Sequence, residues 1–319
     1  KLQETRENNH TLAVERVRKK VLEESILQKQ TLDASSAHSE QTESIDSPRL
    51  IPVEIDYLTL EDELALCNFY ETRIPPMANY FPKEVIENKF TDKVKATAIT
   101  FAKRFYLRNT VMDYHPKEIM YVMCDLALKA TFVVEHSFVA IEEFTKVVKL
   151  PKETIFELEL VVSRSLRYEY AVHHPYLALF GLFLDMQDIP NIKLLYEKSL
   201  ELVNKSLFTD CMFIYQPSQI ALATLRMVAK QDNYDLEKIY LQFKFKSDPK
   251  EKVIELYKIL DEIEDTINSH VNVNVEQAKE IDSRLHNSKK RRREKEELEE
   301  IDRRKKKKLD DEYQKDISK

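Results

Sequence analysis

The chain has 319 residues, a formal net charge of −6 and a single glycine, Gly181. Phosphate-binding loops need several glycines, because only a residue without a Cβ lets the backbone wrap around a phosphate, so enzymes built on such loops are all but excluded. The acidic balance also argues against a dedicated nucleic-acid-binding protein, which should be clearly basic. Abundant Leu, Glu, Lys and Ala favour helices, and we expect an all-α protein.

The cysteines and the apolar runs narrow the class further. Cys67, Cys124 and Cys211 lie far apart and form no CxxC pair, so we expect neither a disulfide framework nor a zinc site. We expect the protein to be located in a reducing compartment. The longest nearly continuous apolar run, 176–184, is well short of the roughly 18 residues that cross a bilayer. We therefore expect no cofactor, no metal and no membrane segment.

The predicted elements begin with a lone N-terminal helix over 1–29, where weak helical periodicity occurs among many charges. A Ser-, Thr-, Asp- and Gln-rich stretch over 30–56 predicts a polar linker. Compact helical sequence begins at Thr59, because the letters TLED predict a capping box in which Thr59 and Asp62 satisfy backbone amides of the first turn.

From Thr59 to about residue 268 the apolar pattern barely pauses, and prolines mark the expected helix starts and stops. Their spacing predicts roughly ten helices of about 10 to 20 residues. These prolines are Pro75, Pro76, Pro82, Pro116, Pro151, Pro175, Pro190, Pro217 and Pro249. A further helix and a charged tail are expected over 269–319.

An internal repeat organises the middle of the chain. Residues 104–129 and 205–230 match at a constant offset of 101, with the core pattern Tyr-x-Pro-x-x-Ile beginning at Tyr114 and again at Tyr215. The repeat predicts two similar helical domains in tandem, over 57–170 and 171–268.

These segments resemble known proteins. Two five-helix repeats of this size resemble the tandem cyclin boxes of cyclins, and KRFYLRNTVMDYHPKEIM (103–120) is similar to the corresponding stretch of the cyclin H group. Further similar segments are LCNFYETRI (66–74), FELELVVSRSLRYEYAVHHPY (156–176) and YQPSQIALA (215–223). The resemblance covers about 57–265 and implies two cyclin boxes with flanking N- and C-terminal helices.

The resemblance also implies a function. A cyclin of this group is a non-catalytic activating subunit of a cyclin-dependent kinase, here in the kinase module of the general transcription factor TFIIH. The implied partners are the kinase catalytic subunit, a RING-containing assembly factor and the TFIIH core, with no direct nucleic-acid or membrane contact. The implied kinase substrates are the C-terminal repeats of RNA polymerase II and other cyclin-dependent kinases.

Two alternatives stay open at this point. Another transcriptional cyclin, paired with an elongation or Mediator kinase, would share both boxes, and only the motif around Tyr114 separates it. A DNA-bound factor with the cyclin fold, resembling TFIIB, would need basic faces and a cysteine-rich zinc ribbon, and this sequence has neither.

Two charges interrupt apolar stripes in the first predicted box. Lys129 continues the stripe of Ile119, Val122 and Leu126, and a lysine extending into solvent at a helix end is the simplest interpretation. Glu159 lies within a stripe that contains Ile155 and Val162, where an ionised carboxylate is costly without a cation nearby.

The resemblance places a kinase-binding role on these residues of the first box, namely Lys129, Glu159, Ile155 and Val162. A structural ion pair internal to the box is the alternative. If the pair binds the kinase, Lys129→Ala and Glu159→Ala should weaken binding and leave the melting of the free chain nearly intact, and Lys230, opposite Lys129 in the repeat, serves as the control.

Three other features of the sequence bear on partner binding, metal binding and location. The chain departs from most cyclins by an insertion at about 131–134, which either enlarges the partner contact or extends the helix. The adjacent His173 and His174 lack a third ligand at metal-binding spacing. Basic clusters in the tail predict either a charged extension or a bipartite nuclear import signal, and hence a nuclear location. Their residues are Lys289, Lys290, Arg291, Arg292, Arg293, Arg303, Arg304, Lys305 and Lys306.

Overall fold

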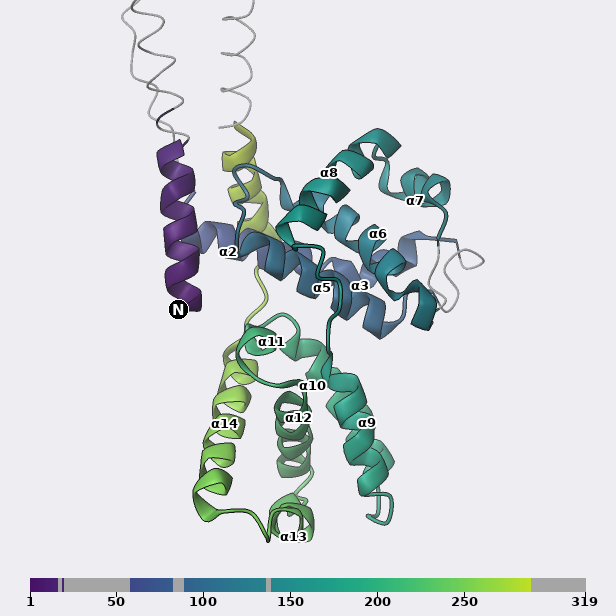
Figure 1. The fold of residues 1–319 in the computed structure, drawn as a ribbon, viewed down its shortest axis with the longest axis vertical. Helices are drawn as coiled ribbons and strands as arrows, with labels where there is room; N and C mark the ends of the chain where they lie inside the picture. The colour runs from purple at the N-terminus through teal and green to yellow at the C-terminus, as the bar shows by residue number, and fades with distance from the viewer. Residues whose placement is uncertain (17–18, 20–57, 83–88, 136–138, 288–319) are drawn as a thin grey trace, which may run out of the picture. The chain divides into compact units, whose positions relative to one another are not determined.

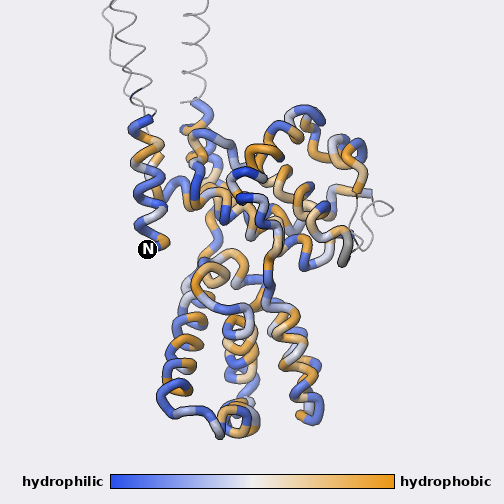
Figure 2. Tube along the Cα trace, viewed as in Figure 1, coloured by the Kyte–Doolittle hydropathy of each residue, from blue (hydrophilic) through white to orange (hydrophobic). Residues whose placement is uncertain are grey.

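The computed structural model describes residues 1–16, 19, 58–82, 89–135 and 139–287, and all regular secondary structure in these ranges is helical (Figure 1). The expected all-α fold is therefore confirmed for the described residues. The predicted linker over 30–56 and the basic clusters of the tail lie outside them. Figure 2 shows apolar and polar residues alternating along the helices, as expected where each helix buries one face.

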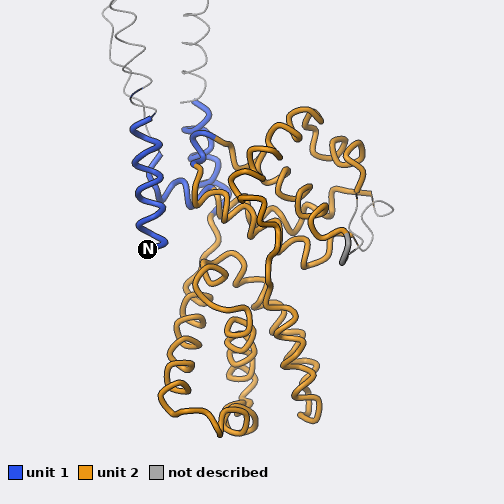
Figure 3. Tube along the Cα trace, in the orientation of Figure 1, with its two compact units in different colours: residues 1–66, 110–113, 274–319 blue, residues 67–109, 114–273 orange. Residues whose placement is uncertain are grey.

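The chain divides into two compact units (Figure 3). The first unit comprises 1–66, 110–113 and 274–319, and the second comprises 67–109 and 114–273. The second unit contains both halves of the internal repeat, except for residues 110–113. The boundaries predicted for two tandem domains stay a prediction.

In the first unit, the capping box predicted from TLED begins helix α2 (Leu60–Glu71). The Thr59 amide donates to Asp62 Oδ2 at 3.1 Å, and the Asp62 amide donates to Thr59 Oγ1 at 3.1 Å. Arg284, on the helix over 275–287, donates to the same Asp62 Oδ2 at 3.1 Å. One carboxylate therefore caps α2 and holds the C-terminal helix against it.

The N-terminal helix over 2–16 packs on the same turn of α2 through a buried polar pair. His10 Nδ1 lies 3.3 Å from Glu63 Oε1, and Glu63 is 7% exposed. Burial, followed by the neighbouring charge of Asp113, raises the pKa of Glu63 to about 8, and burial lowers the pKa of His10. A protonated Glu63 and a neutral His10 therefore share this contact at neutral pH.

We expect Glu63→Gln to remove a pH dependence from the first unit. Because the folded-state pKa of Glu63 lies above its unfolded value, the folded state holds a proton that the unfolded chain releases, so stability falls as pH rises towards about 8. Protection factors of the amides in the helix over 2–16, which are corrected for the intrinsic rise of exchange with pH, should fall between about pH 6 and pH 8 in the wild-type chain and change less in Glu63→Gln. Glu61→Gln, on the exposed side of the same turn, is the matched control, and an unchanged pH profile in Glu63→Gln would contradict the assignment.

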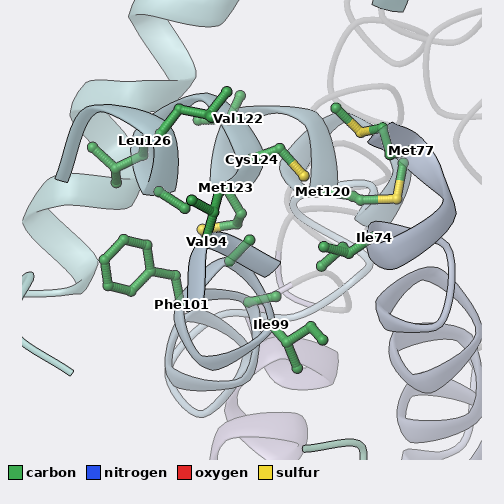
Figure 4. Packing of buried hydrophobic residues seen from close by; sticks show 14 of the residues in the cluster. Ile74, Met77, Val94, Ile99, Phe101, Met120, Val122, Met123, Cys124 and Leu126 are labelled. Atoms are coloured by element: carbon green, nitrogen blue, oxygen red, sulfur yellow. The ribbon is translucent and has the colours of Figure 1, made fainter. Parts of the chain in front are cut away.

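The first half of the second unit is built around α6, which packs against α5 and α8. Thr91 caps α5 by accepting from the Val94 amide at 3.3 Å, Pro116 begins α6, and Pro151 immediately precedes α8. The helices of this half are α3 (Ile74–Met77), the 3₁₀ helix η1 (Ala78–Tyr80), α5 (Asp92–Tyr106), α6 (Pro116–Glu135), α7 (Ile141–Val148) and α8 (Lys152–Ser165). Figure 4 shows part of their core, including Phe101, Met123 and Leu126.

The second half repeats this arrangement around α12, which packs against α9, α10 and α14 (Figure 1). Pro175 begins α9, Pro217 begins α12 and Pro249 precedes α14, as the sequence predicts. The elements are α9 (Pro175–Asp185), α10 (Ile192–Ser206), α11 (Cys211–Ile214), α12 (Pro217–Gln231), the π-helical η2 (Glu237–Leu241), α13 (Gln242–Lys244) and α14 (Lys250–Ser269). Their buried side chains form a second apolar cluster that includes Leu225, Leu260 and Ile267.

The buried Lys103 side chain joins the two halves within the second unit. Lys103 Nζ of α5 lies 2.9 Å from Glu71 Oε2 of α2, and it also donates to the backbone oxygen of Phe208 at 3.1 Å. The Lys103 and Glu71 side chains are both less than a tenth exposed. Removing one member of such a pair strands the other charge in the interior, which typically costs about 3 to 5 kcal/mol.

The helices α6 and α12 differ in length although each begins at the proline of the repeat. α6 has 20 residues and α12 has 15. The additional residues of α6, 131–135, cover the insertion expected at 131–134. Residues 131–135 therefore continue the helix, and Phe132 lies on the surface with 45% of its area exposed.

Candidate partner-binding site

The surface formed by α6 and α8 carries the two charges singled out from the sequence. Ile155 and Val162 of α8 are fully buried, with 0% of their area exposed, in the apolar cluster that also contains residues of α6. They fix α8 against α6. Lys129 and Glu159 project from the rim of this contact with 37% and 21% of their side chains exposed.

Lys129 bridges two carboxylates. Its Nζ lies 2.8 Å from Glu159 Oε2 on α8 and 2.7 Å from Asp125 Oδ2, one turn earlier on α6. The Asp125 side chain is only 2% exposed. The pairing of Lys129 with Glu159 follows the sequence-based expectation, whereas Asp125 is an additional member.

The electrostatics of this cluster keep Lys129 charged. Burial raises the pKa of the Asp125 carboxyl, and its hydrogen bond to Lys129 offsets part of that shift. Burial by itself lowers the pKa of Lys129, but the hydrogen bonds to Asp125 and Glu159 outweigh it and raise that pKa. At neutral pH the site therefore presents a fixed ammonium group between two carboxylates.

Exposed apolar side chains surround this charged cluster. Phe156 and Leu160, one turn apart on α8, are 45% and 49% exposed, and Phe132 lies three residues beyond Lys129 on α6. The Phe156 ring centre lies 5.6 Å from Lys129 Nζ. We call the set of Lys129, Phe132, Phe156, Glu159 and Leu160 the α6–α8 face. Aromatic and aliphatic groups around a fixed charge are typical of a protein-binding surface.

The structure divides the predicted site residues by depth. Lys129 and Glu159 lie at the surface and contact each other. Ile155 and Val162 are core residues with no accessible area, so they support the α6–α8 face and do not form its surface.

Sequence reasoning missed three members of the site. Phe156 and Leu160 fall beside the apolar stripe of α8 and not on it. Asp125 has a recognisable signal, because it stands four residues before Lys129, the spacing of an ion pair within a helix.

The corresponding place in the second half carries a different charge pattern. Lys230 of α12 lies 2.8 Å from Glu264 Oε2 of α14, as Lys129 lies beside Glu159. Arg226 stands where the repeat places Asp125, and its buried guanidinium contacts Glu264 and Asp261. One cation between two carboxylates is thus replaced by two cations and two carboxylates, in which Glu264 lies between Lys230 and Arg226 and Arg226 also contacts Asp261.

The outer surface of α14 also differs from that of α8. In α14, the buried Leu260 and Ile267 correspond to Ile155 and Val162 of α8. In the same alignment, Asp261 corresponds to Phe156 and Asp265 corresponds to Leu160. Both aspartates are exposed. The second half therefore keeps the scaffold and has an acidic surface where the first half has an apolar one.

The histidine pair and the cysteines have structural surroundings. His174 is buried, with Nε2 3.0 Å from Thr97 Oγ1, and burial lowers its pKa to about 4, whereas His173 is exposed. The three cysteine side chains are buried. In the described part of the chain, no three His, Cys, Asp or Glu side chains are grouped as a metal site, and no helix is both long and apolar enough to cross a membrane.

Comparison with known proteins gives three related sequences of similar identity. A family model for the cyclin C-terminal domain matches residues 174–271. Cyclin CCL1 of Saccharomyces cerevisiae is 33% identical over 199 residues, covering 60% of this chain and 46% of that protein. A putative cyclin-H of Dictyostelium discoideum is 32% identical, covering 54% and 61%, and cyclin-H of Xenopus laevis is 30% identical, covering 65% and 64%. The match thus spans between about half and two thirds of each of these relatives.

Two solved structures extend the comparison. A chain of the yeast TFIIK (Kin28/Ccl1/Tfb3) complex is 31% identical, with a TM-score of 0.54, and the match covers 65% of this chain and 87% of that chain. A chain of the Chaetomium thermophilum CAK complex bound to ATP-gamma-S has a TM-score of 0.70 at 23% identity, covering 89% and 82%, which supports the fold. Together with the two repeated helical halves, these matches show that the chain belongs to the cyclin family, among the homologues of cyclin H.

Proposed function

We propose that this chain is the regulatory, non-catalytic subunit of a cyclin-dependent kinase, and that its α6–α8 face binds the mobile regulatory helix of that kinase. The observation that carries the proposal is the fixed ammonium group of Lys129, paired with Glu159 at 2.8 Å and bordered by exposed Phe156 and Leu160. The face offers apolar area for a helix and charged groups that set its register.

Binding at this face accounts for activation without any reactive group in the cyclin. In protein kinases, a glutamate of the regulatory helix must meet the strand lysine that holds the ATP phosphates. A partner that binds only the inward position of that helix shifts the population towards the active kinase. The chemistry of phosphoryl transfer then belongs entirely to the kinase subunit.

The finer assignment follows the cyclin H homologues. The yeast relative is part of a complex named TFIIK, with Kin28 and Tfb3, and the Chaetomium relative is part of a CAK complex. By the same relationship, this chain pairs with a kinase catalytic subunit and a third, RING-containing assembly factor, and it joins the TFIIH core in the nucleus. The substrates of the assembly are then the RNA polymerase II C-terminal repeats and other cyclin-dependent kinases.

Affinity purification of the chain from its own cells, followed by mass spectrometry, tests this assignment. We expect a cyclin-dependent kinase to be recovered together with TFIIH subunits. Recovery of a kinase without TFIIH subunits would instead support another transcriptional cyclin, and recovery of promoter-bound factors without a kinase would contradict the proposal.

The basic tail predicts a separable effect on location. Deleting 289–319 should leave kinase activation intact and reduce nuclear accumulation, because the basic clusters lie outside both repeats. Fluorescence microscopy of the tagged truncation measures nuclear accumulation, and a kinase assay of the purified complex measures activation. Loss of kinase binding in the truncated chain would contradict this division of roles.

A further inference from the structure

Asp125 is a buried charge that the proposed binding surface does not itself require. Its side chain is 2% exposed, and it lies inside α6 among residues of the apolar core such as Cys124 and Leu126. Lys129 and Glu159 already form a pair across α6 and α8. A second carboxylate buried beneath that pair carries a desolvation cost, so its presence calls for a role.

The contacts of Asp125 indicate what that role is. Among the described residues, Lys129 is the cation that pairs with Asp125, at 2.7 Å. An ammonium group has three N–H donors on a flexible four-carbon stem. Asp125 forms an ion pair with this group from within α6, and Glu159 accepts its hydrogen bond from α8, so two carboxylates fix the position of the ammonium group on the α6–α8 face.

The second half of the repeat provides an internal comparison. Lys230 is 53% exposed and pairs with Glu264, but the place of Asp125 is taken by Arg226, which repels an ammonium group and competes for Glu264. Lys230 therefore has a carboxylate on one side only. Of the two lysines that the repeat aligns, only Lys129 is held from both sides.

We propose that Asp125 is a positioning residue for partner binding, which holds the Lys129 ammonium in the place where the α6–α8 face needs it. This inference rests on the proposed function and deepens it. It states that a buried carboxyl group, which itself touches no partner, keeps the Lys129 ammonium group in the position for binding. Asp125 acts through Lys129, and its effect requires Lys129 to be present.

The substitution Asp125→Asn separates positioning from packing. Asparagine has nearly the same shape as aspartate but carries no charge. The core around α6 therefore stays filled, while one of the two ion pairs of Lys129 is lost. Ordering a long side chain on binding has a cost that corresponds to about threefold to tenfold in affinity. We therefore expect the dissociation constant for the kinase subunit to rise about threefold to tenfold. The melting temperature of the free chain should stay the same or rise, since a buried charge has been removed.

A double-mutant cycle with Lys129→Met tests this directly. The dissociation constant of the full chain for the co-purified kinase subunit is measured for the wild type, for both single variants and for the double variant. If Asp125 acts through Lys129, adding Asp125→Asn to Lys129→Met should change affinity less than about twofold. A purely structural role predicts a lower melting temperature with unchanged affinity, and additive losses of affinity in the cycle would also overturn the proposal.

Two controls keep the outcome interpretable. Arg226→Gln, the matched change in the second half, should lower the melting temperature and leave kinase affinity unchanged. Asp125→Ser is the second variant to be measured if Asp125→Asn does not fold.

Two further variants separate failure of the proposed face from failure of the positioning role. If Glu159→Gln and Phe156→Asp leave affinity unchanged, the α6–α8 face is not the binding surface, and the proposed role of Asp125 is wrong as well. If those two changes weaken binding and Asp125→Asn does not, the positioning role alone is wrong.

Discussion

Replacing Phe156 and Leu160 together with aspartate should reduce kinase affinity by about 100-fold or more while leaving the melting temperature of the free chain nearly unchanged. Each side chain is roughly half exposed, so the free chain loses little packing. A partner covering both residues buries only the exposed half of each side chain, which contributes about 1 kcal/mol per residue, and two buried carboxylates would add a desolvation cost. Isothermal titration with the kinase subunit and circular dichroism melting measure the two quantities.

The double substitution gives α8 the pattern that α14 already has, with Asp261 and Asp265 in the corresponding places. Its matched control is Ile254→Asp, because Ile254 of α14 is an apolar residue that is 57% exposed outside the α6–α8 face. Ile254→Asp should leave affinity unchanged. An equal loss of affinity in Ile254→Asp, or no loss in the double variant of α8, would place the interface elsewhere.

Lys129→Ala should both weaken kinase binding and lower the stability of the free chain by about 2 kcal/mol. The sequence alone predicts nearly intact melting, because it shows only the pair with Glu159. The structure changes this expectation for Lys129, since its removal leaves the buried Asp125 carboxylate without a cation, and a stranded charged group costs about 1 to 3 kcal/mol or more. Adding Asp125→Asn should restore the melting temperature without restoring affinity.

The pH dependence of the Lys129→Ala variant has a definite sign. Burial already raises the pKa of Asp125, and loss of Lys129 raises it further. A carboxyl group with a raised folded-state pKa destabilises the fold as pH increases, because the folded state keeps a proton that the unfolded chain loses. The variant should therefore melt at a lower temperature at neutral than at mildly acidic pH, relative to the wild type. A melting temperature that follows the wild type at every pH would contradict this account of Asp125.

Much of the fold could be predicted from local sequence signals. Prolines at the first turn and the TLED capping box have local physical causes, and the structure places helix starts at Pro116, Pro175 and Pro217. The repeat is likewise a property of the sequence itself. The pairing of His10 with Glu63 could not be predicted, because it depends on how two helices far apart in the chain pack together.

The site was predicted less completely, for a physical reason. A helical apolar stripe shows which face of α8 is buried, so Ile155 and Val162 identify the core contact and not the outer surface. The outer surface depends on apolar residues beside the stripe, Phe156 and Leu160, which look unremarkable until their exposure is known. The spacing of Asp125 and Lys129 indicates an ion pair within the helix, but only the structure shows that the Asp125 carboxyl is buried beneath the pair of Lys129 with Glu159.

The most direct test of the central claim is photo-crosslinking in the reconstituted complex of the chain with its kinase. A photoreactive phenylalanine analogue at position 156 of α8, with a matched analogue at position 261 of α14, reports which half of the repeat touches the kinase. We predict that position 156 crosslinks to the regulatory helix of the kinase and that position 261 gives no such crosslink. Crosslinking from position 261, with none from position 156, would show that the α6–α8 face is not the kinase-binding surface.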